Sequence, residues 1–508
     1  MQVEPDFAAF ASIHDSGRGQ AVFARRIADL ETPVSAWLKL AGGCDNSFLL
    51  ESVQGGEFRG RYSVIGIEPD LVWRCCDGRA EIAQGRPEFA PAEMTDRPLE
   101  SLRAIVRATR MELPSSLPPM AVGLFGYLGY DIVRFIEKLG APPPDPLDLP
   151  DAILLRPSVT AVFDNVRDEI LLVTPVWPRT GRDSRTAYDE AARRLAAAGA
   201  SLDAPLPRDL QVPQSSQAHQ IRSNVPRDAY LALVASARDY ILAGDVFQVV
   251  PSQRFHRPFE LPPFALYRAL RRLNPSPFLY HLAFPGFAIV GSSPEILVRV
   301  RDGIVTIRPI AGTRPRGATP EEDARLAREL AADPKEHAEH LMLLDLGRND
   351  VGRVAATGTV KVTDSFFIER YSHVMHLVSN VEGRLRVGLD AVDALIAGLP
   401  AGTLTGAPKI RAMEIIDEFE TEKRGAAYAG AVGYFAANGA LDTCIVLRTA
   451  ILKDGMMYVQ AGGGVVADSA PESEYQESVN KARALFAAAD EAFRFASTGA
   501  PVPESQSK

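Results

Sequence analysis

A proline- and serine-rich stretch divides the chain into two parts with different patterns. Residues 203–226 have no apolar periodicity, which is typical of a linker. Before this stretch, alternating or β-branched runs predict strands, and a long helix is expected only near 186–199. The strand runs are Ser47–Ser52, Tyr62–Gly66, Ala121–Tyr127 and Val159–Val173. We therefore expect an N-terminal domain over residues 1–202 that is built mainly of strands.

The second part, residues 227–497, mixes strand patterns with amphipathic helices and is expected to be a second domain. The predicted strands are Phe287–Val290, Ile296–Val300, Ala429–Phe435, Asp442–Leu452 and Met456–Ala461. The predicted helices are 227–243, 320–332, 334–346, 408–418 and 474–496. Large antiparallel or mixed sheets in a sandwich-like arrangement, covered by helices, satisfy this pattern, so the expected class is α+β. Residues 498–508 are expected to be a disordered tail.

Two pairs of glutamates lie in predicted helices more than a hundred residues apart. Glu336 and Glu339 belong to DPKEHAEHLMLLDLGRND, and Glu474 and Glu477 belong to PESEYQESVNKARAL. The i,i+3 spacing places both carboxylates of a pair on one side of its helix. Such hard oxygen ligands, without nearby cysteine, suit Mg²⁺ that keeps several waters and also binds a substrate oxygen.

The first of these helices has recognisable ends in the sequence. Asp333 is the expected N-cap, Pro334 the first helical residue and Gly347 the end. Glu339 then falls in line with the apolar residues of the helix. A carboxylate that faces inward needs a cation or a metal as its partner.

Simpler interpretations of these residues remain open. Glu336 is also placed to be the third member of a capping box, and Glu477 with Lys481 has the spacing of a surface ion pair. His337 and His340 do not match a zinc helix, and packing or solvent-facing roles suit them better.

Composition and charge exclude several classes of function. The chain has 508 residues, 46% of them apolar, and a net charge of −9, so a concentrated basic surface for nucleic acid is not expected. No apolar run reaches the length of a membrane span, and the N-terminus has no signal-like apolar region. Four cysteines without paired spacing fit a reducing compartment. A soluble, cytoplasmic protein is the prediction.

An anionic substrate would need local cations and backbone donors. The glycine-rich segments 461–466 and 400–409 lack the spacing of a nucleotide-binding loop, but their N–H groups suit a carboxylate. The candidate cations are Lys409, Arg411, Arg448 and Lys481.

Longer strings then carry a family resemblance. They are LLESVQGGEFRGRYSVIG, GDVFQVVPSQRF, GSSPEILVRV, RPIAGTRPRG, KEHAEHLMLLDLGRNDVGRV, SHVMHLVSNVEG, PAGTLTGAPKIRAMEII, YAGAVGYF and QAGGGVVADSAPESEYQESVNKA. In this order the sequence resembles the large subunits of anthranilate synthases, the chorismate-using enzymes that open tryptophan biosynthesis. The resemblance implies the fold of chorismate-binding enzymes.

The resemblance implies ligands for each part of the site. Mg²⁺ would be held by Glu339 and Glu477, with Glu336 and Glu474 acting through water, and it would bind the ring carboxylate of chorismate. The substrate contacts implied are Thr403, Tyr428, Arg448, Gly462, Gly463, Gly464 and Lys481. Arg448 would bind the enolpyruvyl carboxylate, a task suited to a planar fork of donors.

The reaction implied is addition of ammonia at ring C2 with loss of the C4 hydroxyl, followed by elimination of pyruvate. Glu295 matches the family's general acid and would need a raised pKa, which burial can provide. His376 matches the histidine of the elimination step, and Thr403 lies in the same catalytic set. Without the resemblance, Glu295 is a strand-end carboxylate and His376 a core histidine.

Two further positions distinguish relatives that share the substrate. Isochorismate and salicylate synthases use a lysine to activate water where this chain has Gln248. Many aminodeoxychorismate synthases have a nucleophilic lysine where this chain has Ala311. Both positions therefore favour ammonia as the nucleophile and anthranilate as the product.

Ammonia implies a partner. None of the cysteines lies in the setting of a glutaminase nucleophile, so a separate glutamine amidotransferase subunit is expected, in a heterodimer or a heterotetramer. Free ammonium should also support the reaction.

A second pocket, for tryptophan as feedback inhibitor, is implied in the first part of the chain. Its expected residues are Leu50, Glu51, Ser52, Arg61, Ser63, Pro277, Phe278 and Leu279. Ser52 and Glu51 suit the polar end of an amino acid, and Pro277 with Phe278 suits an indole face. Taken alone, these segments are an ordinary strand edge and a turn.

Two rival functions remain. The chain could be an aminodeoxychorismate synthase component, which places the amino group para to the carboxylate. It could also be a non-catalytic amino-acid-binding regulator, although Glu339, His376, Arg448 and Glu477 argue against a pure sensor.

Overall fold

Strands from both parts of the sequence join one large sheet in the computed structural model, which describes residues 1–54, 58–85, 93–178, 181–207, 219–371, 374–425 and 427–496. The sheet contains 22 strands, β11 and β20 form a separate pair, and the described pairings are antiparallel. The strands are β1 (Val3–Glu4), β2 (Gln20–Ile27), β3 (Ser47–Gln54), β4 (Phe58–Cys76), β5 (Arg79–Gln84), β6 (Glu93–Thr95), β7 (Gly123–Leu128), β8 (Ala152–Asp164), β9 (Glu169–Val176), β10 (Arg222–Ser223), β11 (Gln248–Val249), β12 (Ser252–Pro258), β13 (Phe278–Phe284), β14 (Phe287–Ser293), β15 (Ile296–Arg301), β16 (Ile304–Ile307), β17 (Ile310–Pro315), β18 (Lys361–Arg370), β19 (Val374–Arg384), β20 (Gly406–Ala407), β21 (Ala431–Ala436), β22 (Leu441–Ile445), β23 (Thr449–Lys453) and β24 (Met456–Gly462).

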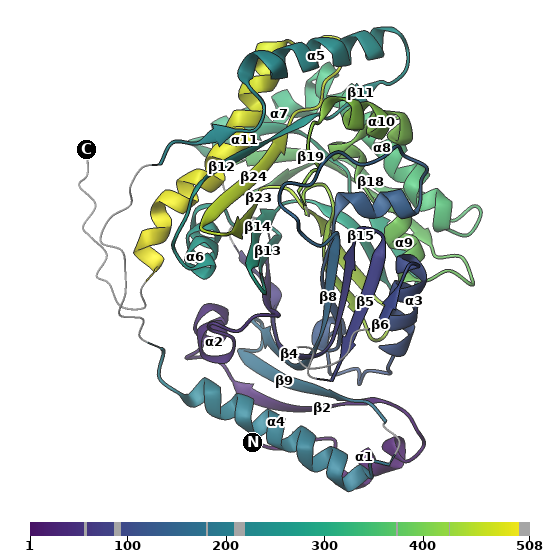
Figure 1. The fold of residues 1–508 in the computed structure, drawn as a ribbon, viewed down its shortest axis with the longest axis vertical. Coiled ribbons are helices and arrows are strands. Elements are labelled where there is room, and N and C mark those ends of the chain that lie inside the picture. The colour runs from purple at the N-terminus through teal and green to yellow at the C-terminus, as the bar shows by residue number, and fades with distance from the viewer. Residues whose placement is uncertain are drawn as a thin grey trace.

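Helices cover the outer faces of the strands (Figure 1). They are α1 (Phe7–His14), α2 (Pro33–Leu40), α3 (Pro98–Ala108), α4 (Ser184–Asp203), α5 (Arg227–Leu242), α6 (Pro263–Leu273), α7 (Pro320–Ala332), α8 (Pro334–Val354), α9 (Ala391–Gly398), α10 (Lys409–Phe419) and α11 (Pro471–Glu491), with short 3-10 turns η1 (Pro119–Ala121), η2 (Tyr130–Phe135), η3 (Gly402–Leu404) and η4 (Ala492–Phe495). The expected α+β class is confirmed. No helix in the described ranges combines the length and apolarity that a membrane span requires.

Helix α8 shows how sequence and packing share the control of one element. The Asp333 carboxylate accepts hydrogen bonds from the backbone N–H groups of Lys335 (2.9 Å) and Glu336 (3.3 Å), so the predicted start is correct. The predicted end at Gly347 is wrong, because the helix continues to Val354. Buried side chains beyond the glycine, such as Val351, outweigh its poor helix propensity.

Two predicted strand runs are each divided by a turn. The run at 159–173 forms the end of β8 and the start of β9, with Asp168 at φ 51° between them. The run at 442–452 forms β22 and β23, with Arg448 at φ 49° between them. Non-glycine residues seldom adopt positive φ, so neither Asp168 nor Arg448 indicated a turn within its apolar run.

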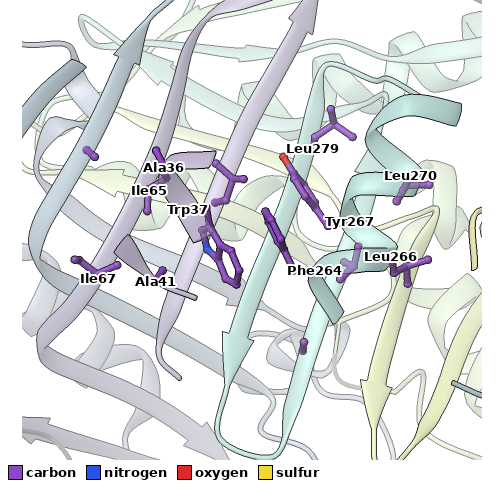
Figure 2. Packing of buried hydrophobic residues seen from close by; sticks show 14 of the residues in the cluster. Ala36, Trp37, Ala41, Ile65, Ile67, Phe264, Leu266, Tyr267, Leu270 and Leu279 are labelled. Atoms are coloured by element: carbon purple, nitrogen blue, oxygen red, sulfur yellow. The ribbon is translucent and has the colours of Figure 1, made fainter. Parts of the chain in front are cut away.

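The hydrophobic core lies in layers. One cluster is supplied mainly by strands that face one another, including Phe48, Phe125 and Tyr280, and it corresponds to the expected sandwich-like interior. Two outer clusters pack helices on the strands: α2, α4, α6 and α11 on one side, and α3, α8 and α9 on the other. In the first outer cluster the ring of Trp37 from α2 stacks on Phe264 from α6, with centroids 3.9 Å apart (Figure 2).

Strand pairing crosses the middle of the chain at two places. β3 pairs with β13, and β7 pairs with β21, so each half of the sequence completes the sheet of the other. Within the expected linker, β10 pairs with β12, while residues 208–218 lie outside the described residues, as does the expected tail at 498–508. The division at 203–226 stays a prediction.

Candidate active site

His376 lies on β19, between β17 and β18. Its Nδ1 is 3.0 Å from the carbonyl oxygen of Gly312 and 3.1 Å from the hydroxyl of Thr313. Because a carbonyl can only accept, Nδ1 carries the proton of the neutral ring, and Nε2 keeps a lone pair with no described partner. Burial lowers the pKa of His376 to about 4. The ring is therefore a neutral base held at one end.

Glu295 lies in the turn between β14 and β15 and is 7% exposed. Burial raises its pKa to about 8, although Thr403, Arg448 and Lys481 act in the opposite direction. This is the direction that the family resemblance requires, and it leaves most of the carboxyl protonated at neutral pH. Glu295 and Thr403 line a small cavity of about 30 Å³.

Arg448 lies beside a larger cavity of about 710 Å³, whose wall also includes Glu477 and Lys481 of α11. Its guanidinium makes no ion pair or hydrogen bond with any described residue, and burial lowers its pKa. The largest influence that favours its charge is that of Glu295. A half-buried cation without a partner is suited to bind an anion.

The other candidate cations already have partners. Lys409 binds Asp350 at 2.9 Å, and Arg411 binds Asp245 at 3.3 Å. Lys481 donates to the carbonyl of Gly462 at 2.9 Å. Among the four, Arg448 is thus the one whose charge is available to a ligand within the described residues.

The glycine run at the end of β24 permits close approach of neighbouring side chains. A Cβ on Gly463 would lie 2.7 Å from Glu474 Oε2, and one on Gly464 would lie 2.2 Å from Gln248 Nε2. Gln248 is buried, and its Oε1 has no described partner. Tyr428 lies behind this run, where burial raises its pKa to about 12 and the Gly462 N–H acts against the rise.

The two glutamate pairs converge from α8 and α11. Burial raises the pKa of Glu339, and repulsion from Glu336 and Glu477 raises it further. The pKa of Glu474 is raised in the same way by burial and by Glu477. Carboxylates that disfavour one another's charge create a site for a cation. They are not a closed ligand cluster, since the described residues contain no group of three side chains arranged to hold a metal.

The simpler interpretations apply to part of this set. Glu336 does not reach back to cap the helix but binds Arg314 at 3.0 Å, and Arg314 also binds Asp333 at 2.8 Å. Glu477 and Lys481 do form the i,i+4 ion pair, at 2.7 Å. The partners Arg314 and Lys481 balance the carboxylates.

Neither histidine of α8 is directed to this site. His337 lies stacked on Phe366, with centroids 4.8 Å apart. His340 shares a hydrogen bond of 2.6 Å with Ser379. Both contacts support the packing role expected for them.

A separate cavity of about 700 Å³ brings together most of the residues expected to bind tryptophan. These are Leu50, Glu51, Ser52, Arg61, Pro277, Phe278 and Leu279. Ser63 is buried behind them, 3.4 Å from Glu51 Oε1. We call this space the β3–β13 cavity.

Within it, Glu51 already has strong partners. Arg271 of α6 donates to both carboxylate oxygens, at 2.5 and 3.0 Å, and the hydroxyl of Tyr267 donates to Oε2. Arg61 is likewise held by Asp164, at 2.9 Å. Glu51 and Arg61 are thus each neutralised by an oppositely charged side chain outside the cavity wall.

With this geometry in place, comparison with known proteins identifies the family. The chain matches the chorismate binding enzyme family over residues 48–487. The chain belongs to the chorismate-binding enzyme family.

Curated relatives and solved structures agree with this family. The chain is 58% identical over 494 residues to anthranilate synthase component 1 of Cereibacter sphaeroides, covering 96% of this chain and 98% of that protein. It is 51% identical over 468 residues to the protein of the same name from Pseudomonas putida, covering 91% and 93%.

Anthranilate synthase component I from Streptococcus pneumoniae superimposes with a TM-score of 0.73 at 37% identity, over 90% of this chain and 98% of that one. The menaquinone-specific isochorismate synthase of Escherichia coli matches in fold alone, with a TM-score of 0.69 at 18% identity, over 95% and 100% of the chains.

Sequence reasoning missed several residues at the candidate active site and at the β3–β13 cavity. Arg314 and Arg271, which bind Glu336 and Glu51, have no motif of their own, although RPRG follows the Gly312–Thr313 pair. Tyr371, whose ring is 5.5 Å from that of His376, precedes SHVMH and was not singled out. Only its place beside a quoted string could have drawn attention to it.

Proposed function

We propose that the chain is the chorismate-converting component of an anthranilate synthase. The observation that carries the proposal is the neighbourhood of Arg448, which influences the pKa of both the buried, protonated carboxyl of Glu295 and the imidazole of His376. Among the described residues, neither the Arg448 guanidinium nor His376 Nε2 has a partner. The relatives above 50% identity carry that name over more than nine tenths of this chain.

The metal proposed is Mg²⁺, for which the donor set is suitable. Glu339 and Glu477 would hold it, and Glu336 and Glu474 would act through water; all four are hard oxygen donors, and their mutual repulsion favours a cation between them. When bound, Mg²⁺ supplies the positive charge that holds the ring carboxylate of chorismate.

The chain's residues then account for binding. Arg448 offers its donors to the enolpyruvyl carboxylate from one wall of the 710 Å³ cavity. Lys481, Tyr428, Thr403 and the backbone at 462–464 complete the proposed contacts.

Proton transfers are divided between two groups. Glu295 gives its proton to the C4 hydroxyl, which leaves as water while the nitrogen of ammonia bonds to C2. The ammonium group that results loses one proton, which restores the Glu295 carboxyl and leaves the amine. His376 Nε2 then accepts the C2 proton as the ring becomes aromatic and the enolpyruvyl C–O bond breaks, and protonation of the released enol gives pyruvate. Chorismate and ammonia therefore yield anthranilate, pyruvate and water.

Two neutral residues support ammonia rather than other nucleophiles. Gln248 cannot deprotonate water, and Ala311 cannot attack the ring. We further propose that ammonia comes from a separate glutamine amidotransferase subunit, consistent with relatives that are named component 1. An aminodeoxychorismate synthase component is the second candidate function. Neither Gln248 nor Ala311 favours it.

The test is product analysis with purified chain, chorismate, Mg²⁺ and ammonium salt at mildly alkaline pH. Fluorescence and mass detection should find anthranilate, and addition of a glutaminase subunit should let glutamine replace ammonium. A para-amino product would assign the second candidate. A hydroxylated product, or none, would refute the proposal.

We also propose that the β3–β13 cavity binds tryptophan as feedback inhibitor. Ser52→Phe should raise the concentration of tryptophan needed for half-inhibition by about tenfold or more, because a phenyl ring overfills the cavity at a steric cost of about 1–3 kcal/mol. Ser52→Ala, which leaves the space open, is the matched control. Unchanged inhibition of Ser52→Phe, measured by anthranilate fluorescence, would remove tryptophan from this cavity.

A further inference from the structure

Tyr371 lies between the two sites just described. It follows β18, is 6% exposed, and lines the β3–β13 cavity. Its ring also meets the ring of His376 edge to face, with centroids 5.5 Å apart and an interplanar angle of 64°. One side chain therefore forms part of the wall of a ligand cavity and touches the proposed base of the active site.

The position of Tyr371 is fixed through its backbone and its hydroxyl. Its N–H donates to the carbonyl of Val374 at 2.8 Å, and its carbonyl accepts from Arg316 Nη1 at 2.6 Å. Its hydroxyl interacts with Glu369, which is bound by Arg308 at 3.0 Å. Glu369 and Arg308 also line the β3–β13 cavity, so a ligand there would contact the ring and its anchors together.

His376 depends on such a neighbour because it is fixed at one end only. Nδ1 is bonded to the Gly312 carbonyl, whereas Nε2 has no described partner that would orient it. The direction of the Nε2 lone pair is therefore set by packing, and the edge contact of Tyr371 is the described aromatic contact of that ring.

We propose that Tyr371 is a positioning residue for His376 and that it couples the two sites. An indole amino acid in the β3–β13 cavity displaces the Tyr371 ring, and the imidazole loses the orientation that proton transfer requires. This inference rests on the proposed function and names how that function is regulated. The part of the structure that changes position is one side chain, that of Tyr371. The contacts of the indole amino acid and those of chorismate both depend on that position.

The experiment compares Tyr371→Leu and Tyr371→Phe with the wild type. Tyr371→Leu should lower kcat by about 10- to 100-fold, as expected for a misplaced catalytic group, with KM for chorismate changed less than about threefold. Tyr371→Phe keeps the ring edge and should retain most of kcat. Tyr188→Leu, at a tyrosine of α4 that packs on Phe7 and lines neither cavity, controls for loss of an aromatic ring.

Binding provides a second measurement that does not require turnover. The Kd of tryptophan, measured by calorimetry with and without chorismate, should differ by about 5- to 150-fold in the wild type, because coupling between sites is reciprocal. In Tyr371→Leu the two Kd values should coincide. In the same variant, Tyr371→Leu, the acid limb of the kcat–pH profile should move to higher pH. The reason is that water reaches the His376 imidazole, and the effect of burial that lowers its pKa is reduced.

Each outcome bears on a different claim. Wild-type coupling that persists in Tyr371→Leu, or a kcat equal to that of the wild type, would overturn the role of Tyr371. A wild type that forms no anthranilate would overturn the proposed function and, with it, the coupling. A Tyr371→Leu protein that does not fold leaves Tyr371→Phe as the test, in which loss of the anchor to Glu369 should still weaken the coupling.

Discussion

At the scale of single residues, the candidate site brings together groups that the fold leaves without a partner. Most buried charges in the protein have partners, such as Arg424 with Glu420 at 2.7 Å. Arg448 and His376 Nε2 have none among the described residues. Such groups cost stability and are expected where a substrate completes them.

Glu295→Gln should lower kcat by about 10²- to 10⁴-fold, because the acid for C4 hydroxyl loss is removed. The wild type should lose activity as pH rises through about 8, where the raised pKa deprotonates the carboxyl. The free energy of unfolding depends on the same proton. Because the pKa of Glu295 is higher in the folded than in the unfolded state, its contribution to stability is full below pH 4.5 and is lost as the pH rises to about 8. The Tm advantage of Glu295→Gln should therefore grow over this range, as calorimetry would detect. A pH-independent difference in Tm would contradict the burial argument.

Arg448→Met should raise KM for chorismate by about 10- to 100-fold, the loss expected for hydrogen bonds from a charged donor. The Tm should not fall, because the guanidinium has no described partner to lose. Arg494→Met, which removes an exposed helical ion pair with Glu491, is the control. An unchanged KM, measured from initial rates, would show that the enolpyruvyl carboxylate binds elsewhere.

The identities of the site residues could be proposed from sequence, but their partners could not. Short strings contain Glu295 and His376 in a characteristic order, and the resemblance that these strings carry adds Arg448. The Glu336–Arg314 pair joins β17 to α8, and the Glu51–Arg271 pair joins β3 to α6. Such pairs depend on how elements pack, and periodicity carries no information on that.

At the scale of elements, α8 is the structure that presents half of the proposed metal site. Its first turn is held by Asp333, which caps the helix and also binds Arg314. Glu336 and Glu339 follow within that turn and the next. The strength of the cap should therefore influence the metal as well as the helix.

Asp333→Ala should lower the free energy of unfolding by about 1 kcal/mol and raise the Mg²⁺ concentration for half-maximal activity by about two- to fivefold. The reason is that the first turn frays and Arg314 is released to neutralise Glu336. Asp345→Ala on the same helix, which removes an exposed pair with Arg348, should change neither quantity appreciably. Equal Mg²⁺ requirements in the two variants, from titrations of initial rate, would argue against the cap's role.

Elements with strong local signals were predicted, and those fixed by packing were not. Helices α5, α7 and α10 lie close to their predicted ranges. The short helices α1, α2 and α9 and the helices α3 and α6 were not expected, because brief apolar stretches fit either a strand or a helix. The extension of α8 beyond Gly347 has the same origin, since burial overrides propensity.

At the scale of the whole molecule, one sheet crosses the boundary that composition suggests. The β3–β13 and β7–β21 pairings place backbone hydrogen bonds between distant parts of the chain. Sequence patterns contain little about which strands become neighbours, so this continuity could not be foreseen. It means that the β3–β13 cavity exists only when both parts are folded together.

Heating or urea should therefore unfold the described fold in one cooperative transition, rather than two for residues 1–202 and 227–497. The physical reason is that loss of either part exposes the paired strand edges of the other. Far-ultraviolet circular dichroism and tyrosine fluorescence should give coincident curves. Two separated transitions would support independent domains and contradict this reasoning.

The contacts behind Glu51 have a consequence for the inhibition proposed at the β3–β13 cavity. Because α6 already supplies a guanidinium and a phenol to this carboxylate, an incoming ammonium exchanges one cation for another instead of meeting a bare anion. The free energy gained at Glu51 on binding is therefore a small difference between its attraction to the ligand ammonium and its attraction to the α6 guanidinium. Substitutions on α6, outside the cavity wall, can therefore move the concentration threshold of inhibition over a wide range while the shape that selects the ligand stays constant.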